Sequence, residues 1–173
     1  GLAGINPTFD IIKLPIEVWK VKFTNIIGFL RDDLAKEYKS DITRKYLSAH
    51  RLEIQPFSGV CIGWQEVYIY AELHPELLNP IMPYQMAEDY LGEVGNNTME
   101  GDIDLCLLPN TRIYLSVFLD DFHPNESLFS YGANRWAGLA GIFIVDPFKI
   151  NNTDFRAEYA RVEPWTYPHK GII

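Results

Sequence analysis

The sequence predicts an all-β protein, an antiparallel up-and-down transmembrane β-barrel of which about eight strands are visible. Three observations predict this fold: apolar and polar residues alternate with a period of two, the alternating segments are long, and their connections alternate between short and long. Period-two alternation is typical of strands that bury one face. We interpret residues 1–173 as a single barrel segment that belongs to a larger barrel and a longer chain.

Eight segments carry the alternation. They span residues 8–14, 17–27, 43–55, 59–71, 98–108, 111–121, 135–145 and 154–163. In the sixth segment, Ile113, Leu115 and Val117 alternate with Tyr114 and Ser116. Most segments run eleven residues or more, which exceeds the roughly 5–6 residues of soluble strands. The lengths instead approach the ~9–11 residues that a tilted strand needs to cross a bilayer.

The connections supply the second signal. Tight turns are predicted at Pro15-Ile16, Pro56-Phe57-Ser58 and Pro109-Asn110, long loops over residues 28–42, 72–97 and 122–134, and an intermediate connection over 146–153. Because short and long connections alternate, the tight turns should lie at one end of the sheet, as in outer-membrane barrels. A soluble β-barrel or sandwich that acts as a binding module shares the period and is the alternative.

Finer features of the strands are also predicted. The alternation changes phase at Gln65-Glu66 and at Ala160-Arg161, which predicts β-bulges there. Aromatic residues near strand ends suggest an interfacial girdle. They are Tyr46, Trp64, Tyr68, Tyr70, Trp136, Tyr159, Trp165 and Tyr167. The charged positions expected to face the lumen are Arg51, Glu53, Glu66, Asp102, Asp104, Arg112, Asp120, Arg156 and Glu158.

Composition excludes other classes of protein. The net charge of −8 argues against a nucleic-acid partner, since phosphate contacts need clustered Lys and Arg. The longest apolar run, residues 136–145, is about half of what a membrane helix needs. A barrel spreads its apolar residues over alternate positions, so a hydrophobic content of 47% without a long run excludes only a membrane helix.

Several runs resemble one family in their order and spacing. They are KYLSAHRLEI at 45–54, GWQEVYIY at 63–70, LNP at 78–80, Glu88, NNT at 96–98, GDIDL at 101–105, LDDF at 119–122 and EYARVEPWTY at 158–167. Together they resemble the bacterial capsule-assembly Wzi family. The resemblance implies a bacterial outer-membrane barrel that attaches or organises capsular polysaccharide, with no enzymatic activity and no cofactor. Its implied partners are outer-membrane lipid and surface polysaccharide.

The longest loop is the first place to expect ligand contacts, because long ordered loops tend to carry function. Residues 84–91 within it predict a short helix, and a second helix is predicted around Leu34. The candidate ligand-binding residues are Glu66, Tyr68, Tyr84, Glu88, Arg112, Asp120 and Asp121. The alternative for this loop is that it folds inward and plugs the lumen.

A catalytic or metal centre is not expected. Glu66 and Asp120 are the only pair that suggests a glycosidase, and Asp121 cannot assist because adjacent strand residues point to opposite faces. We expect Glu66 or Asp120 to form a salt bridge with an arginine such as Arg112 instead. The four histidines lack the spacing of metal ligands. Cys61 and Cys106 lie near tight turns on consecutive strands, a placement compatible with a disulfide or with two free thiols.

Overall fold

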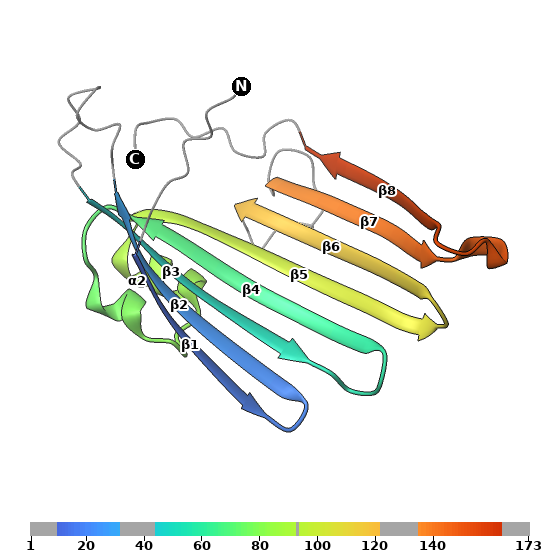
Figure 1. The fold of residues 1–173 in the computed structure, drawn as a ribbon. Coiled ribbons are helices and arrows are strands. Elements are labelled where there is room, and N and C mark those ends of the chain that lie inside the picture. The colour runs from blue at the N-terminus through green and yellow to red at the C-terminus, as the bar shows by residue number, and fades with distance from the viewer. Residues whose placement is uncertain (1–9, 32–43, 93, 122–134, 164–173) are drawn as a thin grey trace.

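A computed structural model describes residues 10–31, 44–92, 94–121 and 135–163 (Figure 1). It confirms the all-β fold: eight antiparallel strands form one sheet in sequential, up-and-down order. The strands are β1 (Asp10–Val18), β2 (Val21–Arg31), β3 (Arg44–Ile54), β4 (Val60–Tyr70), β5 (Gly95–Leu108), β6 (Thr111–Asp121), β7 (Arg135–Val145) and β8 (Asp154–Val162). Among the described residues, no helix is long and apolar enough to cross a membrane.

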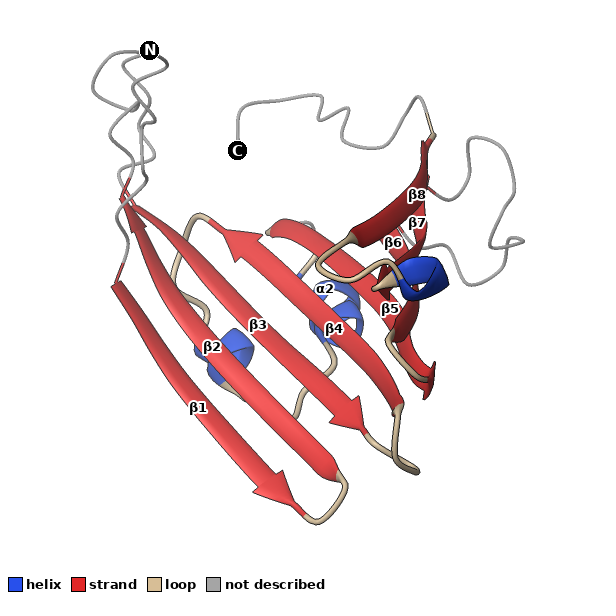
Figure 2. Cartoon of the chain, turned by 45° about the vertical axis from the view of Figure 1, so that its right-hand side comes forward, coloured by secondary structure: helices blue, strands red, loops and turns tan. Residues whose placement is uncertain are grey.

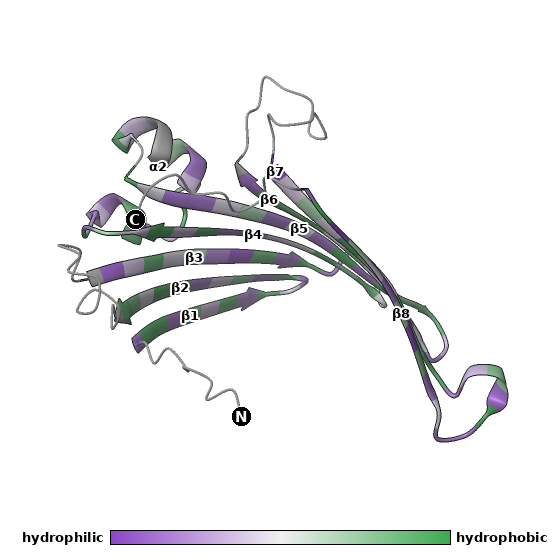
Figure 3. Ribbon diagram, turned by 90° about the horizontal axis from the view of Figure 1, so that it is seen from above, coloured by the Kyte–Doolittle hydropathy of each residue, from purple (hydrophilic) through white to green (hydrophobic). Residues whose placement is uncertain are grey.

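The sheet is twisted and curved. In Figure 2, β1 to β4 are seen face-on, whereas β6 to β8 turn nearly edge-on. β1 and β8 are the two edges of the sheet, and within the described residues they do not pair with each other. Figure 3 shows the period-two alternation as purple and green bands along the strands.

The connections have the predicted polarity. Tight connections join β1 to β2, β3 to β4 and β5 to β6 at one end of the sheet, and the intermediate connection from β7 to β8 lies at the same end (Figure 1). The last of them contains the short 3-10 helix η2 (Pro147–Lys149). The β4–β5 connection at the other end carries the 3-10 helix η1 (Pro75–Leu78) and the helix α2 (Tyr84–Leu91), whose predicted range is confirmed. The helix predicted around Leu34 lies outside the described residues.

The first hairpin differs from the prediction. The turn expected at Pro15-Ile16 was wrong: β1 continues to Val18, which pairs with Val21 across a turn at Trp19 and Lys20. Proline lacks an N–H group, but an edge strand tolerates it because one side of that strand needs no ladder hydrogen bond. Pro15 therefore lies within β1, in register with Thr24, rather than at a turn.

The predicted bulges at Gln65-Glu66 and Ala160-Arg161 were also wrong. The register runs without a shift through β3–β4 at the first place and through β7–β8 at the second. Shifts occur instead between Leu105 and Leu108 and between Leu119 and Asp121. Because the register of β4 is continuous, the change of phase moves the polar residues from one face of the sheet to the other half-way along the strand.

The sheet therefore has two faces and two halves. The Arg51 face contains Arg51 and the residues in register with it, Thr24 and Gln65, and the His50 face contains His50 and its partners Asn25 and Glu66. We call the half near the tight connections the turn half and the half near helix α2 the loop half. Polar residues gather on the Arg51 face in the turn half and on the His50 face in the loop half.

Candidate functional site

A helical insert covers the His50 face of the loop half. The insert is residues 72–92, which include η1 and α2, and it packs against β4 and β5 (Figure 3). The largest buried apolar cluster of the described chain forms at this contact. It consists of Tyr68, Tyr70, Leu77, Tyr84 and Ala87, each no more than 1% exposed. The insert thus lies on the face opposite Arg51.

Glu66 lies at the centre of this contact. Its carboxylate is buried and accepts a hydrogen bond from the backbone N–H of Tyr84, the first residue of α2, at 2.8 Å. The same oxygen lies 3.0 Å from His50 Nε2. The free N–H groups at a helix N-terminus carry partial positive charge, so a carboxylate there is stabilising. Glu66 therefore caps α2 from the neighbouring sheet.

Further polar groups are buried around Glu66. The hydroxyls of Ser48 and Tyr70 are hydrogen-bonded at 2.9 Å, and Asn97 Nδ2 donates to Gln85 Oε1 at 3.5 Å. The Tyr84 ring lies 4.5 Å from the His50 ring between centroids. Burial raises the pKa of Tyr84 above its ordinary value, because the ionised phenol would lose its solvation. The cluster is closed to solvent, so it holds the insert on the sheet rather than receiving a ligand.

A second polar group of residues lies on the Arg51 face of the turn half, and we call it the ladder. It comprises Lys22, Arg51, Glu53, Gln65, Glu100, Asp102, Asp104, Arg112, Tyr114, Arg156 and Glu158. Arg51 and Asp102 form a two-pronged pair, with N···O distances of 2.6 and 2.9 Å. Such forked pairs are strong and fix geometry. The ladder links every strand from β2 to β8 except β7, which Tyr114 crosses to reach Glu158.

In three ladder pairs the cation is more exposed than its carboxylate. Lys22 is 47% exposed against 23% for Glu53, Arg112 is 55% against 24% for Asp104, and Arg156 is 61% against 33% for Glu158. The carboxylates lie close to the sheet, whereas the longer cationic side chains reach outward. Shallow hollows lie between the ladder residues, one of about 240 Å³ beside Arg51 and one of about 320 Å³ beside Arg156.

The His50 face of the turn half is apolar and exposed, and we call it the apolar belt. Its members are Leu14, Ile16, Val18, Ile54, Ile62, Trp64, Ile113, Leu115, Phe155 and Tyr159, each at least 39% exposed. They come from five of the eight strands, β1, β3, β4, β6 and β8. In the described part of the chain, no other layer covers them.

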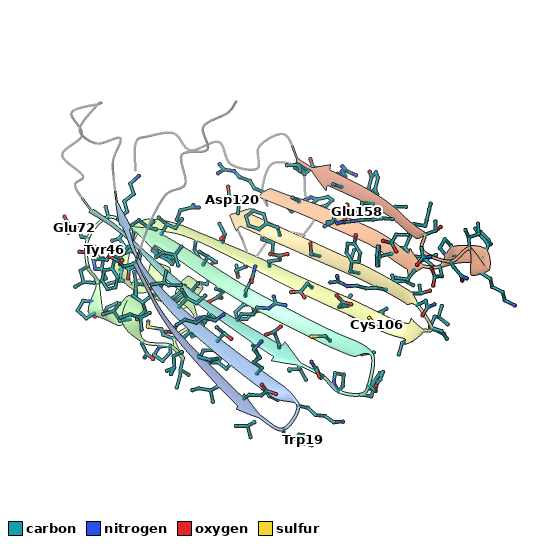
Figure 4. The ribbon with its side chains drawn as sticks, viewed as in Figure 1. Trp19, Tyr46, Glu72, Cys106, Asp120 and Glu158 are labelled. Carbon is teal, nitrogen blue, oxygen red and sulfur yellow. The ribbon has the colours of Figure 1, made fainter. Side chains whose placement is uncertain are left out.

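The candidate ligand-binding residues do not form one site. Glu66, Tyr68 and Tyr84 come together in the buried cluster, each no more than 1% exposed. Arg112 lies on the Arg51 face of the turn half. Asp120 is buried at the loop end of β6, where Asn96 Nδ2 lies 3.4 Å from its carboxylate (Figure 4). The side chains of Glu88 and Asp121 lie outside the described residues.

Two expectations about charges were wrong. Arg112 pairs with Asp104 rather than with Glu66 or Asp120, its Nε lying 2.7 Å from the carboxylate. Glu66 does not face the ladder, because it is in register with His50 whereas Arg51 is in register with Gln65. Glu66 and Asp120 also lie on opposite faces, so these two carboxylates do not assemble a glycosidase pair.

Sequence reasoning missed the pairing of His50 with Glu66. A partial signal exists: a hairpin symmetric about Phe57, the middle of the predicted β3–β4 turn, places His50 opposite Trp64, which lies two residues from Glu66 and on the same face as Glu66. Reading His50 as one of four scattered histidines hid this relation. The sequence reasoning also missed Gln65, which donates to Glu100 Oε2 at 2.6 Å.

The aromatic residues expected near strand ends lie in two different environments. Tyr68 and Tyr70 are buried under the insert instead of lying at an exposed rim. Trp64 and Tyr159 are exposed and belong to the apolar belt, whereas Trp165 and Tyr167 lie outside the described residues.

Among the described residues, the cysteines and the potential metal ligands form no second candidate site. Cys61 and Cys106 are both free thiols, on the neighbouring strands β4 and β5. In the ranges that the structure describes, no group of three or more His, Cys, Asp or Glu side chains is arranged to hold a metal ion.

Comparison with known proteins gives no match. No family model, no curated protein and no solved structure matches this chain. The resemblance to the Wzi family therefore rests on the sequence runs alone.

Proposed function

We propose that this chain is part of the wall of a bacterial outer-membrane β-barrel that attaches or organises capsular or other surface polysaccharide without catalysing a reaction. One observation carries the proposal. In the turn half, an exposed apolar belt covers one face of the sheet while a charged ladder covers the other.

This arrangement suits a wall between lipid and water. A soluble antiparallel sheet turns its apolar face toward a core, and contiguous exposed apolar patches beyond a few hundred Å² are rare on soluble proteins. Hydrocarbon would solvate the belt, and a water-filled lumen would solvate the ladder. Six strands of 11 residues or more have the length for a tilted crossing.

The open edges support a wall that continues beyond β1 and β8. In lipid every backbone N–H and C=O group must be paired, so a spanning sheet has to close or be extended by other strands. Eight strands would enclose an interior just wide enough for side chains. A ladder with exposed cations fits the wider lumen of a barrel with more strands.

Two features support a binding role over catalysis. Glu66 is committed to His50 and to the N-terminus of α2, so the candidate acid is neither exposed nor free. The ladder offers cationic and aromatic groups along a charged face, which are suited to a polar polymer. The polysaccharide itself is suggested by the resemblance to the Wzi family.

Cell fractionation tests the membrane part of the proposal. The full-length gene product carrying this segment should sediment with the outer membrane and require detergent for extraction. Its recovery as a soluble monomer would contradict the proposal and favour the soluble binding module, whose core would have to cover Ile113 and Leu115.

Gene deletion tests the polysaccharide part. Loss of the protein should move surface polysaccharide from the cells into the medium, as measured by carbohydrate content of both fractions. Re-expression of the intact gene should restore retention of the polysaccharide. Re-expression of the variant Glu66→Gln/Asp120→Asn should restore it as well, because the proposed role requires no catalysis by these carboxylates. Unchanged polysaccharide retention after deletion would contradict the proposed role.

A further inference from the structure

The hollow beside Arg156 has the features of a sugar-binding subsite. Its volume is about 320 Å³, near the lower end of the range for small-ligand sites. It is lined by Arg112, Tyr114, Leu139, Phe143, Arg156 and Glu158, all on the Arg51 face of β6, β7 and β8. Two cations thus flank a floor of aromatic and aliphatic side chains.

Gly141 leaves room for the Tyr114 ring in this floor. It lies in register between Tyr114 on β6 and Glu158 on β8. A Cβ atom at this position would overlap the Tyr114 ring, so only glycine lets the ring lie across the backbone of β7. The Tyr114 hydroxyl then donates to Glu158. The floor is therefore held in place by a hydrogen bond at its far side.

The two arginines keep donor capacity for a ligand. Arg112 lies 5.1 Å above the Tyr114 ring centroid, and its Nε and Nη2 pair with Asp104. Arg156 uses Nη2 to donate to Glu158 at 2.6 Å. A guanidinium carries five N–H donors, so both retain donors beyond these contacts. Both side chains are more than half exposed.

We infer that this hollow, between Arg112 and Arg156, binds a carboxylated sugar residue of an acidic polysaccharide. The inference rests on the proposed function and specifies its ligand. The C–H face of a pyranose ring would pack on Tyr114, Leu139 and Phe143. The sugar carboxylate would accept hydrogen bonds from the guanidinium groups, whose planar fork matches a carboxylate. Glu158 does not repel this carboxylate strongly, because Arg156 and Tyr114 already engage it.

Binding of two defined polymers tests the inference. The purified full chain in detergent is titrated with fluorescein-labelled polygalacturonate and, separately, with labelled dextran of matched length, and Kd is measured by fluorescence anisotropy. We expect polygalacturonate to bind more tightly. The double variant Arg112→Gln/Arg156→Gln should weaken its binding by about tenfold or more, as loss of a charge-assisted fork predicts. Dextran binding should not change.

Arg161 provides a matched control. It is 58% exposed and pairs with Glu163 at 2.7 Å, much as Arg156 pairs with Glu158, but it lies on the His50 face. Arg161→Gln should leave polygalacturonate binding within about twofold of the unmodified protein. A second double variant, Arg112→Lys/Arg156→Lys, keeps the charge and loses the fork, so we expect an intermediate loss of affinity.

The outcomes separate this inference from the proposed function. Equal affinity for both polymers, or an equal loss in Arg161→Gln, would overturn the acidic-sugar subsite while a protein found in the outer membrane still supports the barrel. Absence of binding to either polymer by a protein recovered from the soluble fraction would overturn both.

Discussion

The two halves of the sheet differ in whether their charged side chains are buried or exposed. In the loop half, the carboxylate of Glu66 is buried beneath the insert with His50 and the N-terminus of α2. In the turn half, Arg51 and Asp102 form their pair on an uncovered face. The difference arises from what covers each face, because the same strands pass through both halves.

Neighbouring residues show the contrast most directly. His50 and Glu66 are 6% and 1% exposed, whereas Arg51, the next residue on the same strand, has a side chain that is 28% exposed. Breaking a buried polar pair leaves unsatisfied groups in a medium of low dielectric, while water replaces a lost partner at an exposed site. The loop half should therefore depend far more strongly on single charges than the turn half.

Glu66→Ala should have the largest effect. It leaves the N–H of Tyr84 and the Nε2 of His50 without their buried acceptor. The docking of the insert on the sheet should therefore become less favourable by about 3 kcal/mol. The measurement is hydrogen exchange or limited proteolysis over residues 72–92. Glu53→Ala is the control. Glu53 is paired with Lys22 but partly exposed, so its substitution should reduce stability by only about 0.5 kcal/mol. Equal losses in both variants would refute the contrast.

Leu115→Arg tests the assignment of faces in the turn half. Leu115 is 47% exposed in the apolar belt, and an arginine on the lipid face of a barrel costs about 2–4 kcal/mol near the bilayer midplane. Ser116→Arg places the same charge one residue along on the Arg51 face, where it should cost about 0.5 kcal/mol. Urea unfolding of the protein in lipid bilayers compares the two. If Ser116→Arg reduced the free energy of unfolding as much as Leu115→Arg, neither face would be exposed to water.

Gly141→Ala should disturb the ladder through packing alone. The added methyl group meets the Tyr114 ring, and overpacking of this kind costs about 2 kcal/mol. Gly101→Ala is the matched control, since nothing lies within 4 Å of a Cβ atom there and a smaller conformational entropy cost should stabilise the strand by about 0.5 kcal/mol. Urea unfolding under the same conditions measures both. A neutral Gly141→Ala would show that Tyr114 has room to move away.

The strands were predictable because their alternation depends on local chemistry. Six of the eight predicted segments cover at least three quarters of their strands, and the range of α2 was found from the sequence. The first hairpin was not, because Pro15 has the same local signature at a turn and on an edge strand. Only the pairing of Val18 with Val21 distinguishes the two cases.

The sites were less predictable because a face is a property of register. Glu66 and Arg112 both carry charge at positions that alternation alone allows in a lumen. A change of phase in the sequence means either a bulge or a change of covering layer, and the sequence favoured the bulge at Gln65-Glu66. The insert provides the covering layer that makes a continuous register stable, and its docking place depends on contacts distant in sequence.

A final test uses pH to sharpen the comparison. Burial raises the pKa of Tyr84 above its ordinary value near 10, so the docked insert keeps the phenol neutral. Below pH 10 both the docked and the released forms are protonated, and this group adds no pH dependence. As the pH rises above that value, the released form loses its proton while the docked form does not, so docking should weaken progressively. Tyr84→Phe shares every other titrating group and should lose only this part of the alkaline dependence, as measured by hydrogen exchange of the insert between pH 9 and 11. Identical alkaline profiles for the two proteins would mean that the phenol of Tyr84 reaches water while the insert is docked. The separation between a dry loop half and a water-exposed turn half would then fail at one of the fully buried aromatic residues.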